Sequence, residues 1–456
     1  MRCRLAWVVV MLGTTACGSW QRVGSGDKPK PGTTVVPRLF DAASVYRSMG
    51  ALVGGGALPF VASVRYLAGP TPDATLALFS VSLTNQTLSF QRHGNEFSAE
   101  YHVEATFSDS GSLTPTRQIS SDEQIRVRNF QETLRTDESI IFQQFVNVPP
   151  GVYQVAVMLR DRNSPAFARA ERMDTVPRFA DTLPMVTEPL SVYTAEGRPE
   201  RTAQPKLVAN PRSTLPYGTD SLRFYLERYG SPPPQALLAR VVDGTDRELW
   251  RDSVRLTVGA DLAFATVVVP PTSLPVGQAE LQVIAPAGDT AVARFLVSFS
   301  NQWVITNFDE MLNLLRYFER QDWVDSLRRS APDKRSDVWR DFWKETDPVP
   351  LTPENESLDE YLRRVQLANA RFQDEGQAGW LTERGEVFIS LGEPDEIVDM
   401  SSGLDRSAQR VIRWTYTNQR LQLYFQDQGG FGQFRLTPSS RSEFQRVVAR
   451  VRRTSR

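Results

Sequence analysis

The chain has 456 residues, of which 41% are hydrophobic and 23% are charged, so it is long and apolar enough for roughly two to four folded domains. Lysine plus arginine (52) and aspartate plus glutamate (53) nearly balance, and a formal net charge of -1 argues against nucleic acid as a partner. Two cysteines and two histidines exclude disulfide scaffolds, zinc fingers and most metal sites built from these residues. We expect no cofactor and no metal site.

Residues 1–17 predict an export signal. Arg2 and Arg4 give it a positive start, and Leu5–Leu12 is a short apolar run that ends before small residues and Cys17. An apolar run of this length cannot cross a hydrocarbon core of about 30 Å. The segment is therefore typical of a cleaved signal peptide rather than of a membrane span.

The end of this signal resembles a bacterial lipobox, in which the cysteine is lipidated and becomes the mature N-terminus. Thr14 stands where a lipobox usually has leucine, but no cysteine follows Cys17, so the remaining thiol lies where acyl chains such as palmitate would be attached. The alternative is an ordinary cleaved signal that happens to contain a cysteine. The resemblance implies a membrane anchor through the N-terminal lipid. Gly18 rather than aspartate follows Cys17, which favours the outer membrane of a cell envelope.

The middle of the chain has the pattern of β-strands. Residues 18–54 are predicted to be a Gly- and Pro-rich tether with a short helix from Asp41. Two sets of strands bounded by turn residues follow, in 55–197 and in 198–302, and each set predicts an Ig-like β-sandwich. The clearest strand is Glu96–Ser108, in which apolar and polar side chains alternate.

After residue 303 the apolar residues recur at helical spacing. We expect helices that are interrupted at Asp347-Pro348 and restart at Thr352-Pro353, followed by a last amphipathic helix over Arg441–Arg453. Between them, strands are expected at Glu386–Leu391, Val411–Thr417, Leu421–Gln426 and Phe431–Thr437. The predicted fold class is multidomain, mainly β and then α+β: two Ig-like β-sandwiches followed by a helical segment and a small α+β C-terminal domain over 303–456.

A series of short motifs in the segment from 309 to 437 resembles the GWxTD domain of bacterial envelope proteins. The motifs are Trp339-Arg340-Asp341-Phe342-Trp343, Gly379-Trp380-Leu381-Thr382-Glu383-Arg384-Gly385 and Leu391-Gly392-Glu393-Pro394-Asp395-Glu396-Ile397. Glu383 stands where the family name has aspartate. The resemblance implies a domain of unassigned function, so it brings no chemistry with it.

We expect the motif residues to shape turns beside strands. Thr382 and Glu383 would bond backbone amides, Gly385 would adopt a positive φ, and Trp380 would be the apolar contact that fixes the turn. The candidate functional motif is Gly379, Trp380, Thr382, Glu383, Arg384, Gly385, Gly392, Pro394 and Asp395. A ligand-binding loop is the alternative to this architectural role.

Two features keep a glycan-directed function open. Glu383, Asp395 and Glu396 are candidate carboxylates for glycoside hydrolysis or cation binding. A possible aromatic platform for glycan consists of Trp339, Trp343, Trp380 and Trp414. Acids beside turns more often cap amides, and tryptophans at these spacings more often belong to a core. No nucleophile-elbow, HExxH, P-loop or dinucleotide-binding motif occurs, so no catalytic residue is assigned.

The C-terminal segment Arg441–Arg456 is basic, with six arginines against one glutamate. Arg446, Arg450 and Arg453 are predicted to contact anionic head groups or an acidic partner. The alternative is a helix that docks on the sheet and leaves a basic face in water.

These patterns predict an exported, lipid-anchored envelope protein that acts as a non-catalytic protein-interaction or assembly scaffold with an envelope protein as partner. One alternative is a glycan- or peptidoglycan-binding or hydrolysing protein that uses the Trp-rich, acidic C-terminal domain. Another is an assembly factor for outer-membrane proteins.

Overall fold

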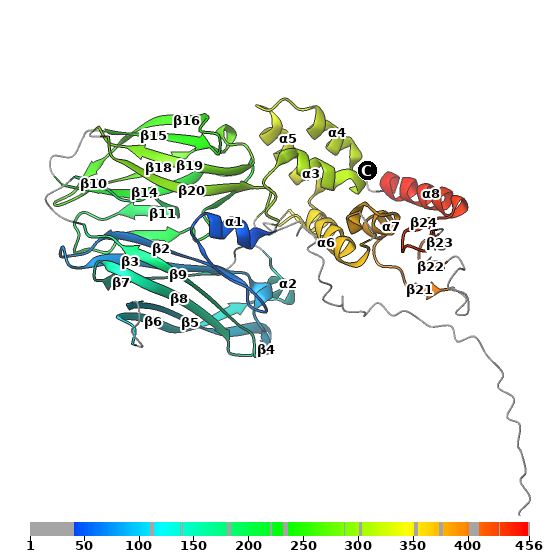
Figure 1. Cartoon of the computed structure of the whole chain (residues 1–456), viewed down its shortest axis with the longest axis horizontal. Coiled ribbons are helices and arrows are strands. Elements are labelled where there is room, and N and C mark those ends of the chain that lie inside the picture. The colour runs from blue at the N-terminus through cyan, green and yellow to red at the C-terminus, as the bar shows by residue number, and fades with distance from the viewer. Residues whose placement is uncertain are drawn as a thin grey trace, which may run out of the picture. The chain divides into compact units, whose positions relative to one another are not determined.

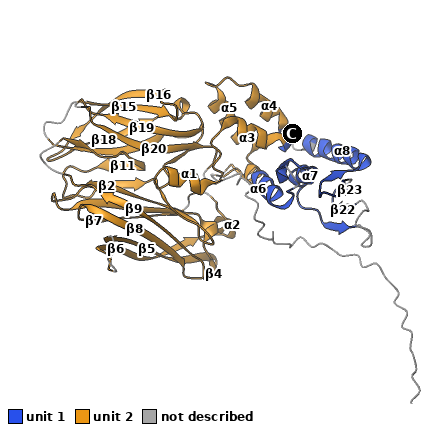
Figure 2. Ribbon diagram, viewed as in Figure 1, with its two compact units in different colours: residues 1–37, 317–320, 361–456 blue, residues 38–316, 321–360 orange. Residues whose placement is uncertain are grey.

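The computed structural model describes residues 41–454, with the exception of 110–113, 137, 139, 180–183, 219–220, 231–235, 287, 301–302, 351–353, 374–376, 401–409 and 428. Cys17, the tether up to residue 40 and the predicted helix start at Thr352-Pro353 lie outside these residues. The chain divides into two compact units, which we describe separately (Figure 2). The β-rich unit comprises 38–316 and 321–360, and the C-terminal unit comprises 317–320 and 361–456.

The β-rich unit begins with α1 (Ala42–Ser48), the short helix predicted after the tether. The Asp41 carboxylate caps it by accepting a hydrogen bond of 3.0 Å from the Ser44 amide. Two antiparallel sheets follow. The first has the order β1-β2-β3-β7 and consists of β1 (Leu52–Gly54), β2 (Phe60–Ala68), β3 (Thr75–Leu83) and β7 (Ile140–Val148). The second consists of β4 (Gln91–His93), β5 (Glu96–Asp109), β6 (Arg117–Val127), β8 (Gly151–Asp161) and β9 (Phe167–Val176).

Two more sheets complete the β part of this unit. The third contains β10 (Met185–Val186), β11 (Leu190–Gly197), β12 (Lys206–Ala209), β14 (Leu222–Tyr229), β17 (Thr257–Val258) and β18 (Ala263–Val269). The fourth contains β13 (Thr214–Pro216), β15 (Ala236–Asp243), β16 (Glu248–Arg255), β19 (Gly277–Ile284) and β20 (Thr290–Ser298). Short helical turns lie between strands at η1 (Asn85–Thr87), α2 (Phe130–Thr133) and η2 (Pro271–Ser273). The protein is thus mainly β with several sheets and some helices, as the sequence predicted at that level.

The first sheet is buried on both faces. Phe79 of β3 packs in one core with Val103 and Leu159 of the second sheet, whereas Leu78 packs in another core with Tyr225 of the third. Every residue of β3 is consequently buried, and its sequence TLALFSVSL lacks the alternation of a strand with one wet face. Figure 1 shows the four sheets lying one above another in the β-rich unit.

A buried ion pair joins the first and third sheets. Arg198 donates from Nε to Glu227 Oε1 at 2.8 Å, and neither side chain is exposed. Arg198 Nη2 also donates to the Ala68 carbonyl at 2.6 Å, and the Ala68 amide donates to the Tyr229 hydroxyl. The Arg198 guanidinium therefore donates hydrogen bonds both to the Glu227 carboxylate and to the carbonyl at the end of β2. Loss of one partner would leave an uncompensated buried charge.

Helices follow the strands, as the change of sequence period predicted. They are α3 (Phe308–Leu314), η3 (Leu315–Tyr317), α4 (Gln321–Arg329), α5 (Arg335–Thr346) and the long α6 (Glu356–Arg371). Asn355 caps α6: its Oδ1 accepts from the Leu358 amide at 2.9 Å, and its Nδ2 donates to the Trp343 carbonyl at 3.0 Å. The helix thus begins after the predicted Thr352-Pro353, at a buried asparagine that also closes the end of α5.

The β-rich unit also holds a partly buried carboxyl, that of Asp359. Trp303 is buried, and its Nε1 donates to Asp359 Oδ1 at 2.8 Å. Burial raises the pKa of Asp359 to about 6, against the opposing effect of the Trp303 hydrogen bond and with a further contribution from the charge of Glu356. Ionised Asp359 is therefore less favourable in the folded protein than in water.

This predicts a pH dependence of stability. Protons bind Asp359 more tightly in the folded state, so its contribution to stability falls as pH rises from about 4 through about 6, by up to about 3 kcal/mol. We expect Asp359→Asn, which keeps an acceptor for Trp303, to stabilise the protein at pH 7.5 and to flatten this part of the profile. Urea unfolding followed by tryptophan fluorescence at pH 5 and pH 7.5 measures both effects. Asp337→Asn on the exposed face of α5 is the control, and an unchanged profile in Asp359→Asn would contradict the prediction.

The C-terminal unit combines an antiparallel sheet with helices. The sheet has the order β21-β22-β23-β24 and consists of β21 (Glu396–Asp399), β22 (Arg410–Tyr416), β23 (Leu421–Asp427) and β24 (Phe434–Leu436). Its helices, besides the later part of α6, are η4 (Gly379–Leu381), α7 (Glu383–Leu391) and α8 (Pro438–Thr454). The last three predicted strands and the last helix are confirmed. None of the described helices of the protein combines the length and the apolarity needed to span a membrane.

The strand predicted at Glu386–Leu391 is wrong, because these residues form most of α7. Val387, Phe388 and Ile389 are all buried, so the helix has apolar residues on more than one side. A short apolar run of this kind has no clear period and reads equally as a buried strand or a buried helix.

Candidate functional site

The segment Gly379–Gly385 forms a helix start. The turn η4 leads into Thr382, whose hydroxyl accepts from the Gly385 amide at 3.0 Å and donates to the Gly379 carbonyl at 2.7 Å. Thr382 is 2% exposed and is the N-cap of α7. The prediction that Thr382 bonds a backbone amide is confirmed, but the predicted turn before a strand is wrong, because a helix follows.

The two glycines of this segment are required by close packing. A Cβ on Gly379 would lie 2.4 Å from the Ala368 carbonyl oxygen in α6, and one on Gly385 would lie 2.1 Å from the Gly379 carbonyl oxygen. Real Cβ atoms do not approach oxygen so closely. Gly385 lies inside α7 and has no positive φ, so the predicted reason for this glycine is wrong. A glycine is needed at position 385 because the backbone of η4 lies against the first turn of α7 there.

Glu383 connects α7 to the C-terminal strand and helix. Its Oε2 accepts from the Leu436 amide of β24 at 2.5 Å and lies 2.9 Å from Arg441 Nη2 of α8. Arg441 also pairs with Glu386 through Nη1 at 2.7 Å. Partial burial would lower the pKa of Arg441, but the hydrogen bonds and charges of Glu386 and Glu383 outweigh it and hold that pKa above its usual value. The carboxylate thus orients the start of α8.

Aromatic side chains form the centre of the C-terminal unit. Trp414 is 1% exposed and packs with Phe372 and Phe425 at ring distances of 5.3 and 4.8 Å. The Arg384 guanidinium lies 4.6 Å from the ring centre of Phe434. Trp380 is half-buried in η4. Trp414 therefore belongs to the core rather than to an exposed platform.

The other two tryptophans of the proposed platform are in α5, within the β-rich unit. Trp339 is 2% exposed and packs on Phe299 at a ring distance of 4.5 Å, and Trp343 is half-buried beside it. These positions are those of core residues, which was the alternative interpretation.

Gly392, Pro394 and Asp395 end α7 and start the sheet. Gly392 is the C-cap of α7 with φ 85°, and its carbonyl accepts from the Tyr416 hydroxyl at 3.1 Å. Pro394 is buried, and Asp395 Oδ2 accepts from the Thr417 amide at 2.6 Å. We expected this segment to lie at the end of a strand, but it ends a helix. Asp395 binds a backbone amide beside a turn, as predicted for the acidic residues of the motif.

The candidate carboxylates are each engaged in a local contact. Glu383 and Asp395 accept backbone amides, and Glu396 lies 3.2 Å from Arg413 Nη2. Within the residues that the structure describes, no three acidic or histidine side chains come together as a metal site would require.

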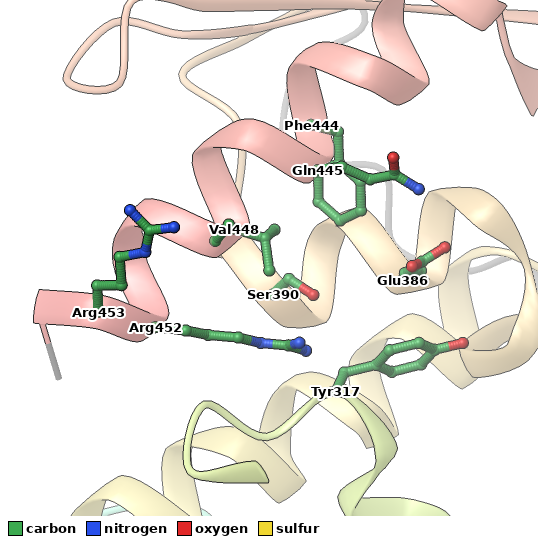
Figure 3. Close-up of a pocket in the computed structure, with 9 residues that line it drawn as sticks. Tyr317, Glu386, Ser390, Phe444, Gln445, Val448, Arg452 and Arg453 are labelled. Carbon is green, nitrogen blue, oxygen red and sulfur yellow. The ribbon is translucent and has the colours of Figure 1, made fainter. Parts of the chain in front are cut away.

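An open groove lies between α7 and α8, with a volume of about 460 Å³. Its lining residues are Tyr317, Glu386, Ser390, Phe444, Gln445, Val448, Ala449, Arg452 and Arg453. Figure 3 shows Arg452 extending from α8 towards Tyr317, with Ser390 of α7 beside it, whereas Arg453 lies at the outer end. Tyr317 is held by α6, because the Tyr361 hydroxyl accepts its amide at 3.2 Å.

The three arginines predicted to contact anionic head groups or an acidic partner lie at different places on α8. Arg453 lines the groove, but Arg446 is exposed outside it, 3.9 Å from Glu443, and Arg450 does not line it. Sequence reasoning missed Arg452, Tyr317 and Ser390. A helical projection of α8 with Phe444 and Val448 on the apolar face places Arg452 four residues further on the same side, which is the signal that could have found it.

Comparison with known proteins identifies part of the chain. Residues 286–443 match the family model of the GWxTD domain. This region is a GWxTD domain. The match ends at Glu443, so the groove residues from Phe444 to Arg453 lie beyond it.

About half of the chain is also similar to parts of larger solved structures. No match appears among curated proteins. Among solved structures, trypsin-activated alpha-2-macroglobulin from Escherichia coli is similar at 17% identity and a TM-score of 0.17, over 53% of this chain and 17% of that chain. Salmonella alpha-2-macroglobulin reacted with methylamine is similar at 16% identity and a TM-score of 0.15, over 53% and 17%. The matched part is thus about a sixth of those chains, and we base no argument on these likenesses.

The glycine packing of the GWxTD domain gives a stability prediction. Gly385→Ala places a Cβ 2.1 Å from a backbone oxygen, so η4 or α7 must move. Overpacking lowers the free energy of unfolding by about 1–3 kcal/mol. We expect a loss at the upper end of this range, because the neighbours of the added Cβ are backbone atoms that cannot move independently. Urea unfolding followed by circular dichroism measures the loss. Gly244→Ala, where a Cβ meets nothing within 4 Å, is the matched control, and equal effects in the two variants would refute the argument.

The Glu383 contacts give a second prediction. Glu383→Ala removes the acceptor of the Leu436 amide and one partner of Arg441, which we expect to cost about 1–3 kcal/mol and to loosen α8. Hydrogen–deuterium exchange of the α8 peptide measures the loosening. Glu443→Ala removes an exposed pair on the same helix and should change stability by less than about 1 kcal/mol. Unchanged exchange of α8 in Glu383→Ala would contradict the assigned role.

Proposed function

We propose that this protein is an exported, lipid-anchored protein of the bacterial cell envelope that acts as a non-catalytic interaction or assembly scaffold through its GWxTD domain. The observation that carries the proposal is the use of the motif's polar groups. Thr382 and Glu383 are both committed to hydrogen bonds inside the fold. Groups committed in this way stabilise the fold and are poorly placed to carry out a reaction on a bound molecule.

The anchor rests on the sequence. Cys17 follows an apolar run and small residues, and no cysteine occurs after it. A diacylated cysteine with a further acyl chain exceeds the two lipid signals that stable anchoring needs. Gly18 after the cysteine favours the outer membrane. The GWxTD domain resembles domains of envelope proteins, which agrees with this location.

The β-rich unit is proposed to contain two Ig-like β-sandwiches. The first pair of facing sheets shares one core, and the second pair is joined by contacts such as Phe224 on Phe295, with ring centres 5.5 Å apart. A β-rich body of this kind suits a spacer or a docking surface. In the proposed role the sandwiches carry the C-terminal unit and add contact area.

The test is crosslinking of the epitope-tagged protein in cells, followed by detergent extraction and mass spectrometry. We expect one reproducible envelope protein to be captured and to be lost with Cys17→Ala, because the anchor brings the two together. Metabolic labelling with an alkyne analogue of palmitate should label the normal protein and not the variant.

Two results would overturn the proposal. Absence of label from the normal protein would remove the anchor. Capture of the protein alone, with no reproducible partner, would remove the scaffold role.

A further inference from the structure

Helix α8 concentrates positive charge in a chain that is otherwise balanced. It carries Arg441, Arg446, Arg450, Arg452 and Arg453 against the single acid Glu443, whereas the whole chain has a net charge of -1. Arg441 is neutralised by Glu383 and Glu386, and Arg446 lies beside Glu443. Arg452 and Arg453 lie in the last turn of the helix, beyond these two pairs.

Two of these arginines line the groove between α7 and α8. Within the described part of the chain, the side chains of Arg452 and Arg453 make no hydrogen bond and no ion pair. Glu386 is the acid among the lining residues, and its carboxylate is bound to Arg441 at 2.7 Å. The guanidinium of Arg452 thus enters a concave surface without a carboxylate partner (Figure 3).

The rest of the groove is partly apolar and partly hydrogen-bonding. Val448 and Ala449 provide an apolar surface on α8 above the buried Phe444, and Ser390 of α7 and Gln445 of α8 provide a hydroxyl and an amide. From Phe444 to Arg453 the helix rises about 14 Å. An extended peptide advances about 3.3 Å per residue, so about four residues fit along the groove.

We propose that this groove binds a short acidic segment of a partner protein, with Arg452 holding a carboxylate and Val448 and Ala449 contacting an apolar side chain of the same segment. The inference deepens the proposed scaffold function and rests on it. Carboxylates match a guanidinium in geometry and charge, because its planar fork donates two parallel hydrogen bonds.

The shape of the site favours a peptide over a membrane surface. A bilayer meets a convex or flat basic face, whereas Arg452 extends into a hollow between α7, α8 and Tyr317. The exposed Arg446 outside the groove would contribute equally to binding at a lipid surface. It should contribute little to binding of a segment within the groove, and this difference makes the two occupants separable by experiment.

The test uses the purified protein and a fluorescein-labelled octapeptide of alternating glutamate and leucine, measured by fluorescence anisotropy. We expect Arg452→Gln to weaken binding at least tenfold and Arg446→Gln, which removes the same charge from the same helix, to weaken it less than twofold. Val448→Asp should also weaken binding at least tenfold, because it places a like charge beside the peptide. An octapeptide of lysine and leucine should not bind. Circular dichroism melting checks that each variant is folded.

Three results would overturn the proposal. The normal protein could fail to bind the acidic octapeptide, or the two arginine variants could weaken binding equally. Vesicles containing phosphatidylglycerol could bind the protein with equal losses in both variants while the octapeptide does not compete, which would assign α8 to the membrane.

If crosslinking captures a partner in cells but the octapeptide does not bind, the scaffold function stands and the groove assignment falls. If the octapeptide binds but no partner is captured, the groove stands as a peptide site and the scaffold function falls.

Discussion

The arrangement of the C-terminal unit depends on one carboxylate, that of Glu383. It reaches from the first turn of α7 to the amide of Leu436 in β24 and to Arg441 at the start of α8. This contact holds the start of a helix of seventeen residues, whose side chains Phe444 and Val447 are buried further along. Because α8 forms one wall of the groove, the Glu383 contact also helps to position that wall.

Close packing explains why small residues are needed beside Glu383. The turn η4 approaches the first turn of α7 so closely that Gly385 has no room for a Cβ, and it approaches α6 so closely that Gly379 has none. Thr382 fits between them because its hydroxyl both donates to the Gly379 carbonyl and accepts the Gly385 amide. Close packing and hydrogen bonding therefore require the same short sequence. In this chain the Thr382 hydroxyl and the two glycines are thus used inside the fold.

The sequence revealed local patterns better than the partners those patterns meet. The alternation in β5 placed Tyr101 and Val103 correctly in the core, because a strand with one wet face shows its period directly. The short run at Val387–Ile389 has no such period, and α7 was therefore read as a strand. The candidate site was predicted in part: the Glu383 amide contact followed from turn chemistry, but its partner Arg441 lies 58 positions away and no local rule identifies it. Helical spacing alone places Arg452 on the same side of α8 as Val448, but the groove that Arg452 enters depends on α7 and Tyr317, which are distant in the sequence.

The polar groups of the Gly379–Gly385 segment and those at the end of α8 are used in different ways. The motif's hydroxyl and carboxylate are satisfied within the fold, whereas the guanidinium groups of Arg452 and Arg453 face a groove. The matched GWxTD residues end at Glu443, and the charged groove wall begins at Phe444. In this chain the Glu383 contact therefore holds the start of α8, and residues beyond the family match supply the side chains with which that helix lines the groove.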